Sequence, residues 1–360
     1  MQKNNQVAYV LGTKAQFIKS KFILEYMVDK GYELTILDTG QHRLITENEL
    51  RYFKNEYSYI NLVDNKKNIS SIHGMIYWFF RIIFFKNINL QGRNLKYCFI
   101  HGDTISTLIG LFIGKRNKLR IVHIEAGLKS NNWFQPFPEE IVRSIVSRYS
   151  DIVSVENEEC YKNIKNKKNK LFIHLRKNTI NDAVLDSLSK VTINKQNKLT
   201  VTVHRTENIY DKRKLNNLVN LLIKIADLNK FESINWYCHD ITRRALKKYG
   251  HEKKLNVKKI NLKDLIPHNE FLIELINSKC VITDGGSIAE ECSILNQNTI
   301  IWRDVVENSN YLKNNVFLSK YNIEEIINFL NNAKITYPNK ENAYSPSLDF
   351  VNQFIDIDNI

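Results

Sequence analysis

The chain has 360 residues, of which 43% are hydrophobic and 25% are charged, and this balance is typical of a soluble globular protein. One hydrophobic core seldom organises so many residues, so we expect two domains of ordinary size. The formal net charge of +14 suggests anionic partners, but most lysines lie in Asn/Lys-rich stretches without interleaved aromatic residues. No recognised nucleic-acid motif accompanies the charge, and we expect no nucleic-acid partner.

In the first half of the chain, short β-branched or aromatic runs alternate with longer amphipathic segments. This alternation is typical of a parallel α/β sheet. No basic and apolar leader precedes the first run, so export is not expected. The predicted strands cover residues 7–11, 33–38, 97–101, 119–125 and 152–155.

The most apolar segment covers residues 75–85. It is well short of the roughly 20 residues that are needed to span a bilayer, and it contains Arg81. We therefore expect no transmembrane segment and predict a buried helix. A second interpretation is that its aromatic side chains touch a membrane surface.

The same rhythm restarts after the basic stretch around residues 166–170. The sequence thus predicts an α/β protein with two successive Rossmann-like doubly wound domains, residues 1–174 and 175–342. The predicted strands of the second domain cover residues 199–204, 233–238, 281–283 and 299–302.

The five cysteines form no close pair in the sequence. An odd number of cysteines scattered on apolar runs fits reduced thiols in the core better than disulfides or a metal site. We therefore expect a cytoplasmic protein. The five are Cys98, Cys160, Cys238, Cys280 and Cys292.

Polar clusters directly follow several predicted strands. In open α/β sheets the ligand binds outside the carboxyl ends of the strands, so these clusters are candidates for a site. The last one is a strand, turn and helix whose backbone N–H groups suit a phosphate, although such a turn often has no ligand. The clusters are Gly12-Thr13-Lys14 with Lys19, His101-Gly102-Asp103-Thr104, His123-Ile124-Glu125-Ala126-Gly127, His204-Arg205-Thr206-Glu207-Asn208 and Asp284-Gly285-Gly286-Ser287.

Each cluster also has a purely structural interpretation. Asp103 can cap a helix, Glu125 can end a strand in a surface loop, and His204 can be a hydrogen-bonded core histidine. Acids, bases and a histidine nevertheless recur at equivalent strand ends of both domains. We therefore expect them to converge on one cleft as an active site.

Residues 136–140 read Pro-Phe-Pro-Glu-Glu. Proline restricts the residue before it and is favoured in the first turn of a helix. This pattern places Glu139 and Glu140 at a helix start, where the dipole stabilises carboxylates. A structural cap is the alternative to a catalytic role.

Together these stretches resemble successive motifs of the UDP-N-acetylglucosamine 2-epimerase family, in the family's order from residue 12 to about residue 307. The resemblance is specific for this superfamily because it rests on the combination of all these motifs rather than on any one of them. Its motifs are Gly12-Thr13-Lys14 with Ile18-Lys19, Thr39-Gly40-Gln41-His42-Arg43, His101-Gly102-Asp103-Thr104, His123-Ile124-Glu125-Ala126-Gly127-Leu128, Pro136-Phe137-Pro138-Glu139-Glu140, Val203-His204-Arg205-Thr206-Glu207-Asn208 and Thr283-Asp284-Gly285-Gly286-Ser287 with Glu290-Glu291.

The resemblance implies a glycosyltransferase-B-like fold, in which two Rossmann-like domains face a cleft and a C-terminal helix, residues 343–360, crosses back onto the first domain. It implies an isomerase that needs no metal and no cofactor, binds a UDP-sugar and forms a homodimer. It also implies a role in making precursors of surface polysaccharides.

The resemblance assigns roles to matching positions. Three carboxylates would be the acids and bases around the sugar, with a histidine beside the diphosphate: Asp103, Glu125, Glu139 and His204. The nucleotide and diphosphate would be held by Lys14, Lys19, Phe271 on uracil, Gly285, Gly286, Ser287 and Glu291. A second, activating UDP-sugar would contact Gln41, Arg205 and His239.

Three departures from the family pattern concern the diphosphate. Lys14 stands where arginine is usual, which loses a bidentate fork and keeps the charge. The turn reads Asp284-Gly285-Gly286-Ser287 instead of Asp-Ser-Gly-Gly, and Asn308 stands where a basic residue is expected. The predicted acids are intact, so the reaction class is better specified than the substrate.

Epimerisation at carbon 2 of an N-acetylhexosamine removes a proton that is not acidic. The family's solution is to expel UDP as the proton leaves, which gives 2-acetamidoglucal, and then to add both back with the proton on the other face. Carboxylates on two sides of the ring suit this reaction. Three alternatives remain: a hydrolysing epimerase that releases N-acetylmannosamine and UDP, a glycosyltransferase of the same fold, and a UDP-sugar binding protein without activity.

Overall fold

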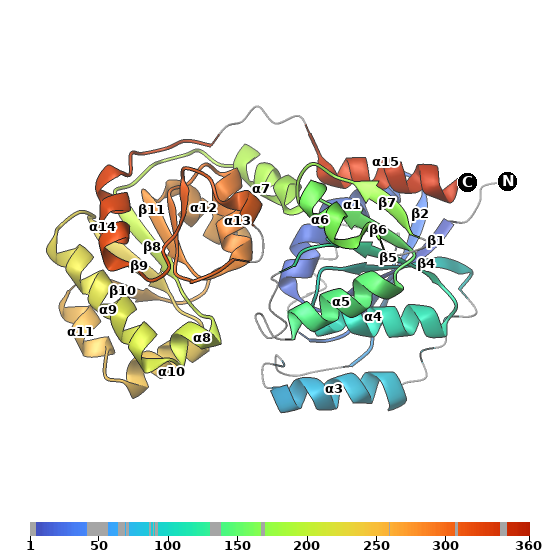
Figure 1. The fold of residues 1–360 in the computed structure, drawn as a ribbon, viewed down its shortest axis with the longest axis horizontal. Helices are drawn as coiled ribbons and strands as arrows, with labels where there is room; N and C mark the ends of the chain where they lie inside the picture. The colour runs from blue at the N-terminus through green and yellow to red at the C-terminus, as the bar shows by residue number, and fades with distance from the viewer. Residues whose placement is uncertain are drawn as a thin grey trace. The chain divides into compact units, whose positions relative to one another are not determined.

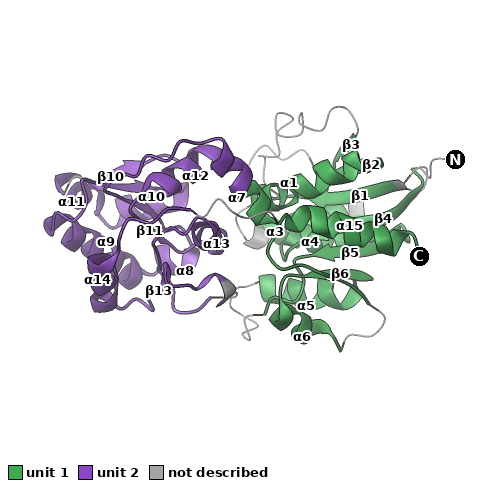
Figure 2. Cartoon of the chain, turned by 90° about the horizontal axis from the view of Figure 1, so that it is seen from above, with its two compact units in different colours: residues 1–183, 344–360 green, residues 184–343 purple. Residues whose placement is uncertain are grey.

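The computed structural model divides the chain into two compact units, residues 1–183 with 344–360 and residues 184–343 (Figures 1 and 2). The boundary predicted from the sequence was between residues 174 and 175. The next nine residues stay with unit 1 because Asn178 bonds to Glu125 there and Asp182 accepts the backbone N–H of Ser347. The described residues are 5–41, 57–63, 69, 72–85, 88, 90, 93–129, 138–166, 170–258, 260–306, 309–338 and 344–360.

In the described part of unit 1, seven parallel strands form one sheet in the order β3-β2-β1-β4-β5-β6-β7. The chain order reverses between β1 and β4, which is where open α/β sheets bind ligands. The strands are β1 Asn5–Leu11, β2 Tyr32–Asp38, β3 Tyr57–Asn61, β4 Leu95–His101, β5 Arg120–Ile124, β6 Ile152–Val155 and β7 Leu171–His174.

Helices cover both faces of this sheet (Figure 1). Consecutive residues of the central strands are buried on opposite faces: Tyr9 packs in one core cluster and Val10 in the other. This explains why the strands are continuous apolar runs. The helices of unit 1 are α1 Lys14–Asp29, α3 Ile72–Phe85, α4 Ile105–Arg116, α5 Glu139–Tyr149, α6 Glu158–Ile164 and α15 Pro346–Asp358. Helix α7, Ile180–Ser189, spans the boundary between the two units in the sequence.

The C-terminal helix α15 belongs to unit 1, far in sequence from the strands it covers. Phe350 and Phe354 pack edge-on against Phe99 of β4, with ring centroids 6.1 and 4.8 Å apart. At the end of the helix, the buried carboxylate of Asp358 accepts hydrogen bonds from the hydroxyls of Tyr32 and Tyr97, at 3.0 and 2.9 Å. Helix α15 begins at Pro346 and packs into the core of unit 1.

In the described part of unit 2, six parallel strands follow the order β10-β9-β8-β11-β12-β13, with a reversal between β8 and β11. The strands are β8 Lys198–Thr202, β9 Ser233–Tyr237, β10 Ile260–Lys263, β11 Cys280–Thr283, β12 Thr299–Ile301 and β13 Val316–Leu318. The helices are α8 Thr206–Ile209, α9 Lys212–Asp227, α10 Asp240–Lys248, α11 Glu252–Val257, α12 His268–Asn277, α13 Gly286–Ile294, the 3-10 turn Ser309–Tyr311 and α14 Ile323–Asn332. Two parallel sheets with alternating helices confirm the predicted α/β class.

The five cysteines occupy core positions, as predicted: all are buried and unpaired. Burial raises the pKa of each thiol to about 12, so they are inert at neutral pH. Among the described residues, no helix has both the length and the apolar character to cross a membrane.

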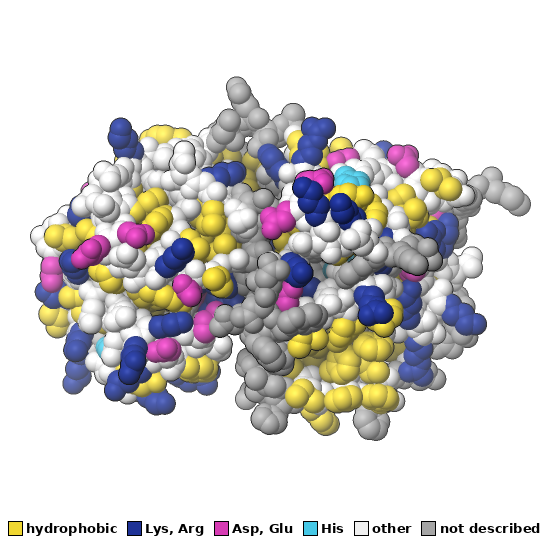
Figure 3. All heavy atoms as spheres, in the orientation of Figure 1, with side chains coloured by type: hydrophobic (Ala, Val, Ile, Leu, Met, Phe, Trp, Pro, Cys, Tyr) yellow, Lys and Arg dark blue, Asp and Glu magenta, His cyan; other side chains and the backbone are white. Residues whose placement is uncertain are grey.

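The helix predicted at residues 75–85 lies within α3, but it is buried on one side only. Trp78 and Ile82 of α3 are buried, but Tyr77 and Phe84 on its other side are 70% and 68% exposed. The sequence is apolar on all sides of the helix, and unit 1 covers only one of them. Figure 3 shows the resulting hydrophobic surface.

Candidate functional site

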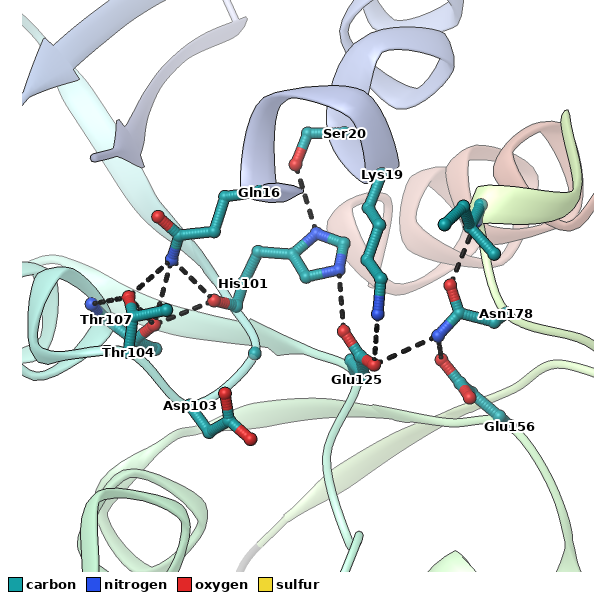
Figure 4. Close-up of polar contacts among 12 residues, drawn as sticks. Gln16, Lys19, Ser20, His101, Asp103, Thr104, Thr107, Glu125, Glu156 and Asn178 are labelled. Atoms are coloured by element: carbon teal, nitrogen blue, oxygen red, sulfur yellow. Dashed lines mark hydrogen bonds and ion pairs between the residues drawn. The ribbon is translucent and has the colours of Figure 1, made fainter. Parts of the chain in front are cut away.

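Glu125 is the centre of a polar cluster at the carboxyl ends of β1, β4 and β5 (Figure 4). Its Oε1 accepts from Lys19 Nζ at 2.6 Å and from Asn178 Nδ2 at 3.0 Å, and its Oε2 lies 3.2 Å from His101 Nε2. The side chain is only 10% exposed. Burial alone would raise the pKa of Glu125, but Lys19 and His101 outweigh it and hold the pKa well below its usual range.

The backbone of Glu125 has φ of 66°, in the left-handed region that a residue with a side chain seldom occupies. The strand ends at Ile124, whose carbonyl accepts from Gly102, and Ala126 is tied to Ser154 in β6. Neighbouring hydrogen bonds and the three side-chain partners thus fix this conformation. Strained residues of this kind persist where the surroundings over-determine them, and they cluster at functional sites.

His101 is fully buried and connects Glu125 to helix α1. Ser20 Oγ lies 3.0 Å from its Nδ1. Burial lowers the pKa of His101, so the ring is neutral at pH 7. Because an ionised carboxylate only accepts, Nε2 of His101 carries the proton that faces Glu125, and Nδ1 accepts from the hydroxyl of Ser20.

Asp103 lies two residues after His101, in the turn that follows β4. Arg143 of α5 binds its Oδ2 through Nη2 at 2.6 Å and Nε at 2.7 Å. The same guanidinium reaches Glu140 at 3.0 Å. Glu139, the preceding residue, begins α5. Arg143 therefore ties the turn that carries Asp103 to the helix start that carries Glu139.

The turn between β1 and α1 is packed against the start of α4. Gln16 accepts from the backbone N–H groups of Gly12 and Thr13, each at 3.1 Å, and donates to the carbonyl of His101 at 2.8 Å. A Cβ on Gly12 would lie 2.0 Å from Ser106 Oγ, so only glycine fits. This packing sets where α1 begins, and with it the positions of Lys14, its first residue, and Lys19.

In unit 2 the turn after β8 is held by Asp284, which is fully buried at the end of β11. Its carboxylate accepts from the backbone N–H of His204 at 3.0 Å and of Arg205 at 2.8 Å, and from Asn208 Nδ2 at 2.9 Å. The His204 ring stacks on His239, with centroids 4.2 Å apart. Burial, and then the neighbouring His204, lower the pKa of His239 to about 4.

Helix α13 starts beside this histidine pair. Gly285 is its N-cap, and Gly286 is its first residue. A Cβ on Gly285 would lie 3.5 Å from the ring of His204, whereas a Cβ on Gly286 would meet no protein atom within 4 Å. The N–H groups of a first helical turn have no partners inside the helix. This end of α13 is therefore suited to an anion.

Two further predicted residues, Glu291 and Phe271, are related by helix α12: Phe271 is part of it, and Glu291 contacts another of its residues. Glu291 of α13 is buried, and its Oε1 accepts from His268 Nε2 at 2.8 Å. Phe271, one turn after His268, packs edge-on against Tyr237 with centroids 5.2 Å apart. The arrangement offers an aromatic ring and a carboxylate on adjacent helices.

Some of the predicted residues are in direct contact within each unit. Unit 1 joins Lys19 directly to Glu125, and it holds Gln41 at the end of β2, where Ser106 Oγ donates to it at 2.6 Å. Unit 2 brings together His204, His239 and Gly285. Arg205 pairs with Glu207 at 2.6 Å. Of the remaining predicted positions, Pro136, Phe137 and Asn308 lie outside the described residues.

Four residues of these groups are not among those predicted from the sequence. His101 and Asp284 were in recognised clusters but had no role assigned. Arg143 had a usable signal, because it follows Glu139 by four residues on one helix face. Asn178 had none, since only the path of the chain after β7 brings it to Glu125.

Solved structures share this fold. The chain superposes on the UDP-GlcNAc 2-epimerase of Methanocaldococcus jannaschii in complex with UDP-GlcNAc and UDP, with a TM-score of 0.77, 23% identity and coverage of 98% and 99% of the two chains. The superposition on the enzyme of Neisseria meningitidis bound to UDP-GlcNAc has a TM-score of 0.76 at 21% identity, with the same coverage of the two chains. The superposition on a glycosyltransferase from Rickettsia africae has a TM-score of 0.53 at 12% identity and covers 99% of this chain and 98% of the other. The two-domain glycosyltransferase-B-like fold is confirmed, and it is shared by more than one class of enzyme.

Sequence relatives are more specific. A UDP-N-acetylglucosamine 2-epimerase of Methanocaldococcus jannaschii is 28% identical, covering 84% of each chain. One from Campylobacter jejuni is 26% identical, covering 84% of this chain and 82% of the relative. Residues 25–356 match the family described as UDP-N-acetylglucosamine 2-epimerase. Because that match spans most of the chain, the protein belongs to the UDP-N-acetylglucosamine 2-epimerase family.

Proposed function

We propose that this protein converts UDP-N-acetylglucosamine to UDP-N-acetylmannosamine by eliminating UDP and adding it back. As a member of its family the protein is an isomerase that acts at carbon 2 of a UDP-N-acetylhexosamine. The observation that carries the proposal is the buried Glu125 carboxylate, which Lys19, Asn178 and His101 hold at the carboxyl end of β5. Relatives bind UDP-GlcNAc and UDP on the same fold.

In the proposed first step, a carboxylate takes the proton from carbon 2. The C–H electron pair forms the double bond between carbons 1 and 2, and the bond from carbon 1 to UDP breaks, so that UDP leaves with its electron pair. In the return step an oxygen of UDP attacks carbon 1, and the double bond takes a proton at carbon 2 from the opposite face. The reaction is redox-neutral, and we assign no cofactor to it.

We assign proton transfer to Asp103, Glu125 and Glu139. Two of these carboxylates already face cations, Glu125 with Lys19 and Asp103 with Arg143. Lys19 and His101 hold the pKa of Glu125 below its usual range, so this carboxylate is ionised and able to accept a proton. Acids on more than one element allow protons to be exchanged on two faces of a ring.

We assign the nucleotide to unit 2. His204 and the start of α13, with Gly285, Gly286 and Ser287, would bind the diphosphate, since uncapped N–H groups and the helix dipole stabilise negative charge. Phe271 would stack on uracil, near Glu291. Lys14 and Lys19 would add positive charge as UDP departs. Gln41, Arg205 and His239 remain the proposed contacts of an activating UDP-sugar.

The biological setting is also a proposal. Five buried, unpaired thiols are compatible with a reducing compartment, and we propose the cytoplasm. There the product would serve as a precursor of surface polysaccharide. We further propose a homodimer.

Proton NMR of the reaction in deuterium oxide tests the function. Incubation of the pure protein with UDP-N-acetylglucosamine should yield UDP-N-acetylmannosamine with deuterium at carbon 2, because the returning proton comes from a group that exchanges with water. Free N-acetylmannosamine and UDP as sole products would instead show a hydrolysing epimerase. Transfer of the sugar to a glycan acceptor without epimerisation would show a glycosyltransferase, and binding with no turnover would show a UDP-sugar binding protein.

A further inference from the structure

Glu156 is a buried carboxylate beside the polar cluster of unit 1, and the proposed mechanism does not use it. It directly follows β6, as Glu125 directly follows β5, and these two strands are neighbours in the sheet. Only 6% of Glu156 is exposed. Burying a carboxylate is costly unless its oxygens find donors, so its hydrogen bonds indicate its role.

Helix α6 does not account for Glu156, although it begins at Glu158. The N-cap of this helix is Asn157, whose Oδ1 accepts from the backbone N–H of Cys160 at 2.8 Å. The Glu156 carboxylate instead accepts from Nδ2 of Asn178 at 2.5 Å, 22 positions later in the chain. Glu156 therefore bonds to the segment between β7 and α7, away from its own helix.

The amide of Asn178 connects Glu156 to Glu125 (Figure 4). Its Nδ2 donates to Oε1 of Glu156 at 2.5 Å and to Oε1 of Glu125 at 3.0 Å. A primary amide has two N–H donors, so each carboxylate takes one of them. On its other side, Oδ1 of Asn178 accepts from the backbone N–H of Ile180 at 2.9 Å. Only one orientation of the amide satisfies all three contacts, because a flipped amide would turn its oxygen towards both carboxylates.

The Glu156 carboxylate is the acceptor for one of these two N–H groups. Asn178 is only 5% exposed, so without Glu156 this N–H would be buried without an acceptor. An unsatisfied buried donor costs more than the net gain of one hydrogen bond. The amide would then rotate towards another acceptor, and this rotation would move its second N–H away from Glu125.

The two carboxylates lie in one neighbourhood. After burial, the negative charges of Glu156 and Glu125 both raise the pKa of the Cys160 thiol. Glu125 has its own cation, because Lys19 Nζ lies 2.6 Å from Oε1. Neighbouring carboxylates repel each other, and the two donors of Asn178 offset this repulsion. The amide thus allows the two acids to be buried side by side.

We propose that Glu156 is a positioning residue, whose carboxylate fixes the Asn178 amide in the orientation that holds Glu125 for proton transfer. This inference rests on the proposed function, which assigns proton transfer to Glu125. Glu156 touches no reacting atom, since Asn178 lies between the two carboxylates. Its replacement should therefore affect kcat and leave the binding of UDP, which we assign to unit 2, unchanged.

Steady-state kinetics with UDP-N-acetylglucosamine tests the role of Glu156. In Glu156→Leu we expect kcat to fall about tenfold, the effect of one hydrogen bond to a charged group, with KM unchanged. Glu156→Gln keeps an oxygen that accepts from Asn178 and should recover most of the activity. Glu156→Asp keeps the charge but withdraws it by one methylene, so its kcat should fall by less than that of Glu156→Leu. Glu159→Leu is the control, because Glu159 is exposed on α6 and should match the wild type.

A double-mutant cycle tests whether Glu156 acts through Asn178. Asn178→Leu should lower kcat by itself, and Glu156→Leu should then add little, because the amide is already absent. NMR of the Asn178 side-chain N–H groups, identified by the signals missing in Asn178→Leu, gives a result without substrate. In Glu156→Leu, or in Glu156→Asp should the leucine variant not fold, these signals should shift and exchange faster with water.

Three results would overturn the positioning role of Glu156. The first is wild-type kcat and unchanged amide signals in a folded Glu156→Leu or Glu156→Asp. The second is an equal fall in kcat for Glu156→Gln and Glu156→Leu, which would show that the charge matters and the bond to Asn178 does not. The third is full additivity in the double variant. A wild type without epimerase activity would refute the proposed function instead, and the amide signals would still decide whether Glu156 fixes Asn178.

Discussion

The ammonium group of Lys19 lies 2.6 Å from Oε1 of Glu125, and the two side chains are only 11% and 10% exposed. Such a buried pair forms a single electrostatic unit, because either partner alone would be an uncompensated charge. It links helix α1 to the end of β5, across 106 residues of sequence. The consequences reach both stability and catalysis.

Replacing Lys19 by Met should lower the free energy of unfolding at pH 7 by about 3 kcal/mol, since it leaves the Glu125 carboxylate buried without its cation. The folded state lowers the pKa of Glu125, so the pair stabilises the protein above the ordinary carboxyl pKa of about 4.3 and ceases to do so as the pH falls through the lowered value. The difference between wild type and variant should therefore narrow from pH 7 towards pH 3.

Urea unfolding at several pH values measures this difference. Lys21→Met is the matched control, because Lys21 pairs with Glu25 at 3.7 Å on the same helix but is more exposed. It should change stability by less than about 0.5 kcal/mol. A Lys19→Met variant as stable as Lys21→Met would contradict the view that the pair is electrostatically coupled.

Gly286→Val tests the start of α13. A Cβ at this position meets no protein atom within 4 Å, so the variant should fold with an unchanged melting temperature. The branched side chain would nevertheless stand where the diphosphate must approach the backbone. Calorimetry should show the dissociation constant for UDP raised about tenfold or more, the effect of losing one charge-assisted hydrogen bond.

Gly286→Ala should give a smaller effect in the same direction, since its side chain is shorter. If UDP binds Gly286→Val with wild-type affinity, the turn has a structural role only. A lower melting temperature without UDP would point instead to a local packing defect.

Asp358→Asn should loosen the C-terminal helix. Asp358 accepts from Tyr32, Tyr97 and Lys96. Burial opposes ionisation, yet these donors hold its pKa below the usual range. A neutral amide makes weaker bonds, so we expect a loss of about 2 kcal/mol in stability. Thermal unfolding measures it, and Asp356→Asn on the exposed side of the same helix is the control. Equal melting temperatures for the two variants would rule out this role for Asp358.

The role of the three carboxylates Asp103, Glu125 and Glu139 in turnover should be separable from nucleotide binding by mutation. Asp103→Asn, Glu125→Gln and Glu139→Gln should each reduce kcat far more than UDP affinity, because they remove proton-transfer groups in unit 1 and leave unit 2 unchanged. Steady-state kinetics and calorimetry give the two quantities. Glu158→Gln, a change at an exposed position of α6, should affect neither.

Release of 2-acetamidoglucal and UDP by one of these variants would identify a residue needed mainly for re-addition. Full activity in any of the three would remove that residue from the mechanism. A loss of UDP affinity as large as the loss in kcat would show that the carboxylate acts in binding.

The central strands were predictable because they are buried on both faces and read as unbroken apolar runs, as β1 and β4 do. The edge strands were not. In β3, at the edge of its sheet, Ser58, Tyr59 and Asn61 are exposed, and β13 has only three residues. β3 mixes polar and apolar residues, and β13 is too short to show a periodic pattern, so neither strand can be recognised from its own sequence.

The sequence by itself determined the α/β class, the order of the polar clusters and the family to which they belong, because each depends on residues close together in the chain. It did not determine which side of α3 is buried, because a helix that is apolar on all sides has no polar face to show which side is exposed to solvent. Nor did it assemble the partners of Glu125, which come from positions 19, 101 and 178. Only the tertiary structure decided those, because parallel strands and their connections bring their carboxyl ends to one edge of the sheet.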